Sequence, residues 1–135
     1  MKLAVDSSVL LAIFNKEPGA EDWLEALIDA RRHGRLAICE VVYAELAQVL
    51  PSQSELGAVL KKLGIQFDAI QAEAAWLARQ TFKAYRLAGG PREHIVPDFL
   101  IAAHARVQAD RLAAIDRGYI RRYFPDLALH YPRLP

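Results

Sequence analysis

The sequence predicts a three-layer α/β/α fold in which helices cover both faces of a central, mostly parallel sheet of about five strands. Short apolar runs alternate with longer segments whose apolar residues recur at helical spacing, as expected for parallel strands joined by helices. Apolar residues make up 53% of the 135 residues, enough to cover both faces of a sheet. No repeat, low-complexity segment or long linker interrupts the pattern, so we expect one domain over residues 1–135.

Each predicted strand is a short run of apolar residues that ends at a polar residue or a turn. A buried strand of a parallel sheet is apolar throughout because both of its faces are covered. The last run should form an edge of the sheet. These strands are expected at residues 3–5, 36–39, 65–67, 111–115 and 127–131.

The predicted helices lie between these strands. Asp68 and Gln71 have the spacing of a capping box, which would open a helix that continues to about residue 87. Pro97 suits the first turn of another helix, since proline lacks the amide hydrogen that is unpaired there anyway. The full set is expected at residues 8–15, 20–33, 41–50, 54–63, 68–87, 97–109 and 117–123.

The overall charge and the single cysteine exclude some classes of protein. With 17 basic and 16 acidic residues the net charge is +1, so charge alone would not hold the chain on nucleic acid. Cys39 has no second cysteine with which to form an intramolecular disulfide. No apolar stretch reaches the roughly 18 residues of a membrane span, and no signal cleavage site is visible. We therefore expect a cytoplasmic protein with no membrane contact.

Four acidic residues are predicted to meet at one edge of the sheet. Asp6 follows the first strand, Asp116 follows the fourth, and Glu45 lies about one turn into the helix after the second. Asp98 begins the helix that runs back to the fourth strand, so it should start at the same edge. Converging carboxylates repel one another unless a cation lies between them. Oxygen ligands favour Mg²⁺ or Mn²⁺, so these residues are candidate metal ligands and catalytic groups.

Each acid also has a structural interpretation that the sequence leaves open. Asp6 and Asp116 could cap the helices that follow them, and Asp98 could complement the dipole of its own helix. Glu45 could face solvent, although its helix is largely apolar. Ser8 could assist the site with its hydroxyl or be the N-cap of the first helix. Two further acids, Asp68 and Asp126, are assigned to a capping box and a turn rather than to the site.

The order of four segments resembles the PIN-domain family, in particular the VapC-like toxins of bacterial toxin–antitoxin pairs. The segments are VDSSVLLA at residues 5–12, VYAEL at 42–46, PDFLIAAHA at 97–105 and AIDRG at 114–118, with RRYFPDL continuing at 121–127. The resemblance implies a Mg²⁺- or Mn²⁺-dependent endoribonuclease with Asp6 and Asp98 as the core metal ligands. Glu45 and Asp116 would help to hold a metal or position water. Ala114 departs from the family, which often has threonine there.

The resemblance also implies partners. VapC-like proteins usually form homodimers and are neutralised by a small antitoxin, and the apolar helix pair at residues 41–63 could receive its C-terminal segment. RNA phosphates or bases could contact basic and aromatic residues near the acids. The basic candidates are Arg92, Arg117 and Arg121, accompanied by His94, Tyr119, Arg122 and Tyr123. A solvent-exposed amphipathic helix explains the last group equally well.

Three other functions compete with this one. A phosphatase of the haloacid dehalogenase type needs a second aspartate two residues after its nucleophile, where this chain has Ser8. A signalling receiver domain needs a late lysine, and the last lysine here is Lys83. A binding module that kept the fold without catalysis is disfavoured because all four acids are present.

Overall fold

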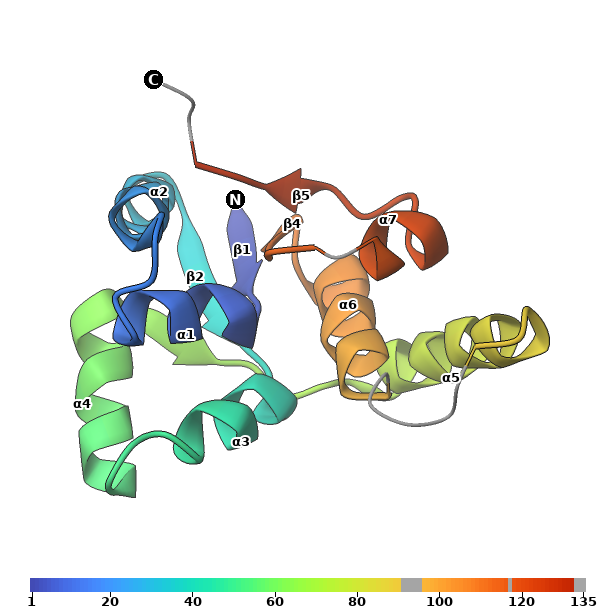
Figure 1. Cartoon of the computed structure of the whole chain (residues 1–135), viewed down its shortest axis with the longest axis horizontal. Coiled ribbons are helices and arrows are strands. Elements are labelled where there is room, and N and C mark those ends of the chain that lie inside the picture. The colour runs from blue at the N-terminus through green and yellow to red at the C-terminus, as the bar shows by residue number, and fades with distance from the viewer. Residues whose placement is uncertain (91–95, 117, 133–135) are drawn as a thin grey trace.

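The computed structural model describes residues 1–90, 96–116 and 118–132 and contains a five-stranded sheet that is parallel throughout (Figure 1). The strand order is β3-β2-β1-β4-β5, so β5 lies at an edge as predicted. The predicted fold class is confirmed. The strands are β1 (Lys2–Val5), β2 (Arg35–Ile38), β3 (Ile65–Phe67), β4 (Arg111–Ala113) and β5 (Leu129–His130).

Seven helices are found in the described residues, and each predicted helix has an observed counterpart. The boundaries agree within a few residues because the apolar spacing marks each helix, whereas its ends depend on local capping. Gly64 is an example, since it ends α4 with φ of 71° in the left-handed region. The helices are α1 (Ser7–Phe14), α2 (Ala20–Arg32), α3 (Glu40–Ala47), α4 (Gln53–Leu63), α5 (Ala72–Leu87), α6 (Val96–Gln108) and α7 (Tyr119–Tyr123).

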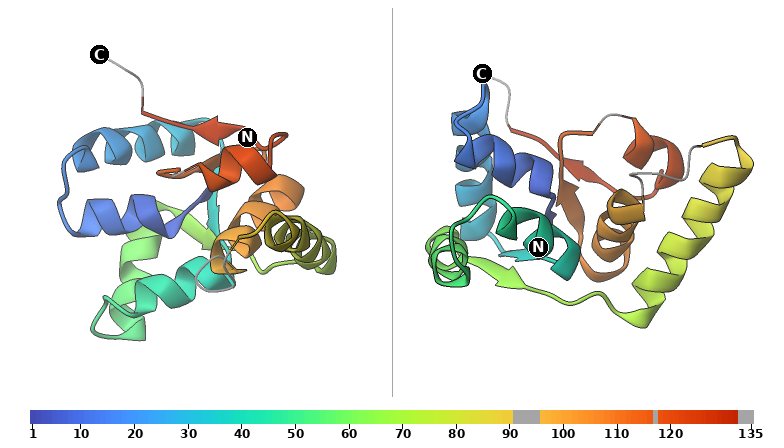
Figure 2. Two further views of the ribbon diagram at one scale, coloured as in Figure 1. Left: turned by 45° about the vertical axis from the view of Figure 1, so that its right-hand side comes forward. Right: turned by 60° about the horizontal axis from the view of Figure 1, so that its bottom comes forward.

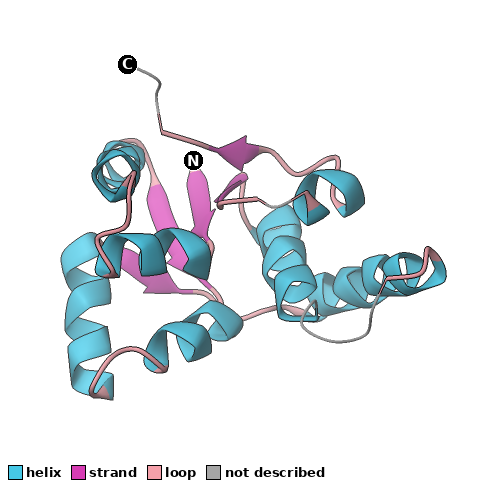
Figure 3. Cartoon of the chain, viewed as in Figure 1, coloured by secondary structure: helices cyan, strands magenta, loops and turns pink. Residues whose placement is uncertain are grey.

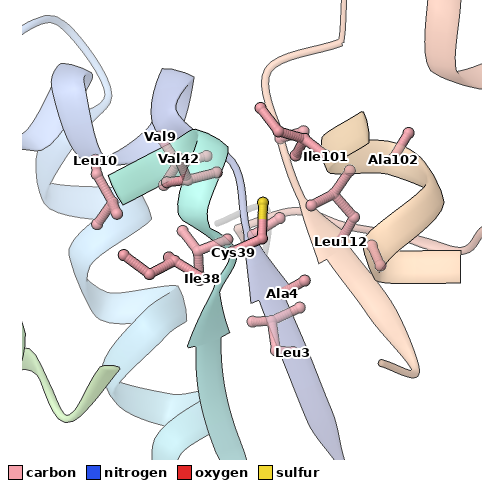
Figure 4. Packing of buried hydrophobic residues seen from close by; sticks show 14 of the residues in the cluster. Leu3, Ala4, Val9, Leu10, Ile38, Cys39, Val42, Ile101, Ala102 and Leu112 are labelled. Carbon is pink, nitrogen blue, oxygen red and sulfur yellow. The ribbon is translucent and has the colours of Figure 1, made fainter. Parts of the chain in front are cut away.

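The sheet lies between two groups of helices. α1 and α2 pack together on one side with α3 beside them, whereas α5 and α6 pack against each other on the other side (Figures 2 and 3). Side chains from both groups meet the strands. Val9 and Leu10 come from α1, Ile101 and Ala102 come from α6, and the strands lie between them (Figure 4). The apolar runs of β1, β2 and β4 are therefore buried, as expected for a doubly covered sheet, whereas the edge strands β3 and β5 are only partly buried.

The strand order changes direction at β1. The chain builds β2 and β3 on one side of β1, then returns to build β4 and β5 on the other. In sheets of this kind a crevice opens at the carboxyl ends of the strands that flank the reversal. The amide of Asp6 donates to the carbonyl oxygen of Ala113 at 2.8 Å, which ties the ends of β1 and β4 together. The site should therefore lie next to these two strand ends.

Asp68 does not cap a helix, so the capping-box prediction is wrong. α5 begins at Ala72, and its N-cap residue Gln71 makes no side-chain capping bond. The Asp68 carboxylate instead accepts hydrogen bonds from Lys2 Nζ at 2.8 Å, from His104 Nε2 at 2.9 Å and from a glutamine amide at 3.1 Å. Burial alone would raise the pKa of Asp68, but Lys2 and His104 outweigh burial and lower it. Basic partners from distant strands and helices decide the role of this residue.

His104 and Cys39 are both buried and do not line the cavities described below. His104 is 1% exposed and contacts Asp68, and Cys39 is buried in the core. None of the helices in the described part of the chain is long and apolar enough to cross a lipid bilayer.

Candidate active site

A cavity of about 540 Å³ opens beside the ends of β1 and β4 and contains three of the four predicted acids. Its position agrees with the reversal of strand order at β1. A larger cavity of about 690 Å³ lies between α2 and β5, but none of the four acids lines it. The acidic cavity is lined by Asp6, Ser7, Ser8, Leu11, Glu17, Asp98, Ile101, Ile115, Asp116, Tyr119 and Ile120.

Asp6 caps helix α1 and also lines this cavity. It precedes α1 and accepts a hydrogen bond from the amide of Ser8 at 3.3 Å, as the capping interpretation predicted. Burial raises its pKa, although the Ser8 hydroxyl and the first amides of α1 lower it in part. A carboxylate that is taken out of water in this way has a strong need for a cation. The capping role and a metal-binding role are therefore compatible for this residue.

Ser8 is not the N-cap of α1, because it lies inside the helix and Asp6 occupies the cap position. Its hydroxyl donates to the carboxylate of Asp6 and accepts from the amide of Ile115 at 3.1 Å. One hydroxyl thus connects the end of β1 with the segment after β4. That segment leads directly to Asp116, so Ser8 helps to position two of the predicted acids.

Glu45 reaches the site through Ser7. It lies on α3 and does not line the cavity, but its Oε1 accepts a hydrogen bond from the Ser7 hydroxyl at 3.1 Å. Burial raises the pKa of Glu45 and the charge of Asp6 raises it further, while Ser7 lowers it in part. Sequence reasoning missed Ser7. Its hydroxyl marks no motif by itself, and only the packing of α1 on α3 brings it to Glu45.

Asp116 is held by several donors at the start of α7. Its Oδ1 accepts from the amides of Gly118 at 2.9 Å and Ile120 at 3.2 Å, and its Oδ2 accepts from Arg121 Nε at 3.0 Å. Its side chain is 2% exposed. Burial alone would raise its pKa, but the guanidinium and the amides together lower it. Asp116 therefore stays ionised more readily than Asp6.

The basic candidates are only partly described. Arg121 pairs with Asp116, and its role toward RNA stays a prediction. Arg92, Arg117 and His94 lie outside the described residues.

Asp98 is the third predicted acid that lines this cavity. It lies exposed in the first turn of α6 and lines the acidic cavity. It also lines a small apolar hollow that adjoins this cavity. Glu17, in the turn after α1, is a further acid on the cavity wall that sequence reasoning did not single out.

The donor chemistry of the cavity fits a hard divalent cation. Its charged lining residues are Asp6, Glu17, Asp98 and Asp116, and carboxylate oxygens are the ligands that Mg²⁺ and Mn²⁺ prefer. Among the residues that the structure describes, no three acidic, histidine or cysteine side chains lie close enough to hold one ion as they stand. A Mg²⁺ ion usually keeps several waters and needs only one or two carboxylates. The raised pKa values of Asp6 and Glu45 agree with carboxylates that lack a neutralising charge.

The parallel sheet and its acidic cavity define a three-layer α/β protein with a carboxylate-lined cleft at the strand reversal. The PIN domain model matches residues 3–125, so the chain belongs to the PIN domain family. The resemblance that the sequence motifs indicated is confirmed at this level.

Solved structures share the fold at low sequence identity. VapBC2 from Rickettsia felis, bound to a promoter DNA fragment, is 17% identical with a TM-score of 0.75, covering 98% of this chain and 100% of that one. VapBC-1 from nontypeable Haemophilus influenzae is 15% identical with a TM-score of 0.71, covering 97% and 98%. FitAcB from Neisseria gonorrhoeae is 19% identical with a TM-score of 0.63, covering 96% and 97%. No curated protein sequence gives a significant match.

Proposed function

We propose that this protein is a metal-dependent endoribonuclease that hydrolyses RNA phosphodiester bonds and acts as the toxin of a toxin–antitoxin pair. One observation carries the proposal: Asp6, Asp98 and Asp116, from distant parts of the chain, line the same cavity at the strand reversal. Glu45 is connected to this cavity through the Ser7 hydroxyl. Membership of the PIN domain family supports this interpretation.

The proposed metal is Mg²⁺ or Mn²⁺, held by Asp6 and Asp98 with help from Glu45 and Asp116. When bound, it would neutralise charge on the phosphate and lower the pKa of a water. The chain's own groups would orient the ligands. Ser8 holds the carboxylate of Asp6, whereas amides and a guanidinium hold Asp116 in its ionised form. In-line attack by water would leave a 5′-phosphate and a 3′-hydroxyl.

The proposed partners are a small antitoxin, RNA and a second copy of the chain, all in the cytoplasm. Structures with the same fold are of VapBC and FitAcB complexes, which supports an antitoxin partner. We place the antitoxin contact on the helix pair α3 and α4. Growth that continues unchanged after induction of the intact protein would contradict the toxin role.

The nuclease proposal is tested with purified protein and RNA, with Mg²⁺ or Mn²⁺ and then with EDTA. Asp6→Asn and Asp98→Asn should each reduce cleavage at least about 100-fold, because metal catalysis contributes several kcal/mol and about 1.4 kcal/mol is tenfold. Asp126→Asn is the matched control, since its side chain is 80% exposed in a turn outside the cavity. Circular dichroism should show that all three variants fold. Cleavage that survives EDTA and both site substitutions would refute the proposal.

A further inference from the structure

Tyr119 occupies a position between the acidic cavity and an apolar hollow. It lines the cavity together with Asp6, Asp98 and Asp116, and it also lines the adjoining hollow, again beside Asp98. Its side chain is 42% exposed, which makes it one of the exposed large hydrophobic residues of the described chain. An exposed aromatic side chain is therefore part of the cavity lining.

The Tyr119 ring contacts a buried tyrosine, Tyr85, that belongs to an aromatic cluster. Tyr85 is 4% exposed and meets Tyr119 edge to face, with ring centroids 6.0 Å apart. Tyr85 also contacts Phe99 at 5.5 Å and Tyr123 at 5.5 Å. An edge-to-face contact uses the edge of one ring and the face of the other, so at least one face of Tyr119 is free of Tyr85.

The charges of the cavity limit how it could hold a nucleotide. Among the described residues that line it there is no lysine or arginine, and four carry carboxylates. Arg121, the nearest described cation on α7, has its Nε bound to Asp116. From the described lining residues alone, a phosphate would meet no positive charge unless a metal were bound. Besides Ser7 and Ser8, the rest of the lining is apolar and suits the flat uncharged face of a base; these residues are Leu11, Ile101, Ile115, Tyr119 and Ile120.

We infer that Tyr119 is a base-stacking subsite for a nucleotide of single-stranded RNA whose phosphate lies at the acidic cavity. This inference rests on the proposed nuclease function and adds a residue that would hold one base of the substrate. A base can offer its face to a side chain only where it is unstacked, as in loops and single strands. Aromatic stacking of this kind contributes with little regard to sequence, because every base has a π-face.

The test uses short single-stranded RNA in which one base is replaced by aminopurine, whose fluorescence falls when it stacks. The replacement is moved along the oligonucleotide, and binding is measured with the native acids in Ca²⁺ in place of Mg²⁺, so that the carboxylates and a divalent cation are kept while cleavage is slowed. Tyr119→Phe should keep the quenching at one position. Tyr119→Leu should abolish it and raise Kd by about five- to 150-fold, the range expected for one stacked base. Tyr131→Leu is the matched control, because Tyr131 is 48% exposed and lines the cavity beside β5 instead.

Three results would overturn the inference: quenching at no position, unchanged quenching and Kd in Tyr119→Leu, or equal losses in Tyr119→Phe and Tyr119→Leu. Cleavage in Mg²⁺ is measured separately. EDTA-sensitive cleavage without Tyr119-dependent quenching would refute the stacking subsite and leave the nuclease function standing. Quenching that depends on Tyr119 in a protein without cleavage would refute the nuclease function and support the subsite.

Discussion

The most informative substitution is Ser8→Ala, which removes one hydroxyl and changes no charge. That hydroxyl donates to the Asp6 carboxylate and accepts from the amide of Ile115 at 3.1 Å. Its loss leaves the buried carboxylate with fewer donors, so the pKa of Asp6 should rise further above its ordinary value. The segment that leads from Ile115 to Asp116 also loses a contact with α1.

The size of the effect follows from the two hydrogen bonds. A bond to a charged group contributes about 1.5–3 kcal/mol and a neutral bond about 0.5–1.5 kcal/mol. Ser8 is half-buried and lines the cavity, so water can replace part of this loss. We expect a fall of about 1–3 kcal/mol in the free energy of unfolding, against a typical total of about 5–15 kcal/mol. The protein should fold, with Tm lowered by roughly 3–6 °C per kcal/mol.

We expect Ser8→Ala to reduce RNA cleavage by more than the lost folding stability alone would cause. Residues that hold a metal ligand typically contribute about 10- to 100-fold to metal affinity or activity. Because metal binds the ionised carboxylate, the loss in Ser8→Ala should be greatest at low pH and smaller at high pH. The assay is RNA cleavage against Mg²⁺ concentration at several pH values, with Ser8→Thr as the control that keeps the hydroxyl. An unchanged Tm together with an unchanged Mg²⁺ and pH dependence would refute this account of Ser8.

Three further outcomes are expected. Ser7→Ala should raise the pKa of Glu45, because the Ser7 hydroxyl that lowers this pKa is lost. NMR titration of the Glu45 carboxyl measures the change. An unchanged pKa would contradict the hydrogen bond between Ser7 and Glu45. Asp68→Asn should reduce the free energy of unfolding by about 1–3 kcal/mol at pH 7. The pKa of Asp68 is lower in the folded protein than in the unfolded chain, where it is about 3.9. The stability that Asp68 contributes is therefore complete above the unfolded pKa and is lost as pH falls through the folded pKa. Denaturation curves of the two proteins should thus converge in acid. Gly64→Ala should destabilise by about 1–2 kcal/mol because of its φ of 71° and because its Cβ would lie 2.5 Å from Arg31 Nε, so that this side chain must shift. Gly57→Ala, inside α4 with open space around it, should stabilise slightly. Equal melting temperatures of the two variants would refute this account of the two glycines.

The elements of the fold could be predicted because their signals are local. The apolar run of β2 and the helical spacing of α4 each depend on neighbouring residues, and the observed elements follow them. Asp68 shows where local patterns fail. Its spacing to Gln71 is that of a capping box, but Lys2 and His104 are distant in sequence and bind it more favourably than the helix end does.

The sequence by itself determined which acids are candidates and at which edge of the sheet they lie. The ends of parallel strands share an edge, so Asp6 and Asp116 could be placed together without coordinates. Only the tertiary structure decided how each acid is held. Hydrogen bonds between side chains depend on packing to within a fraction of an ångström, so Ser7 could be assigned to Glu45 only after α1 had packed on α3.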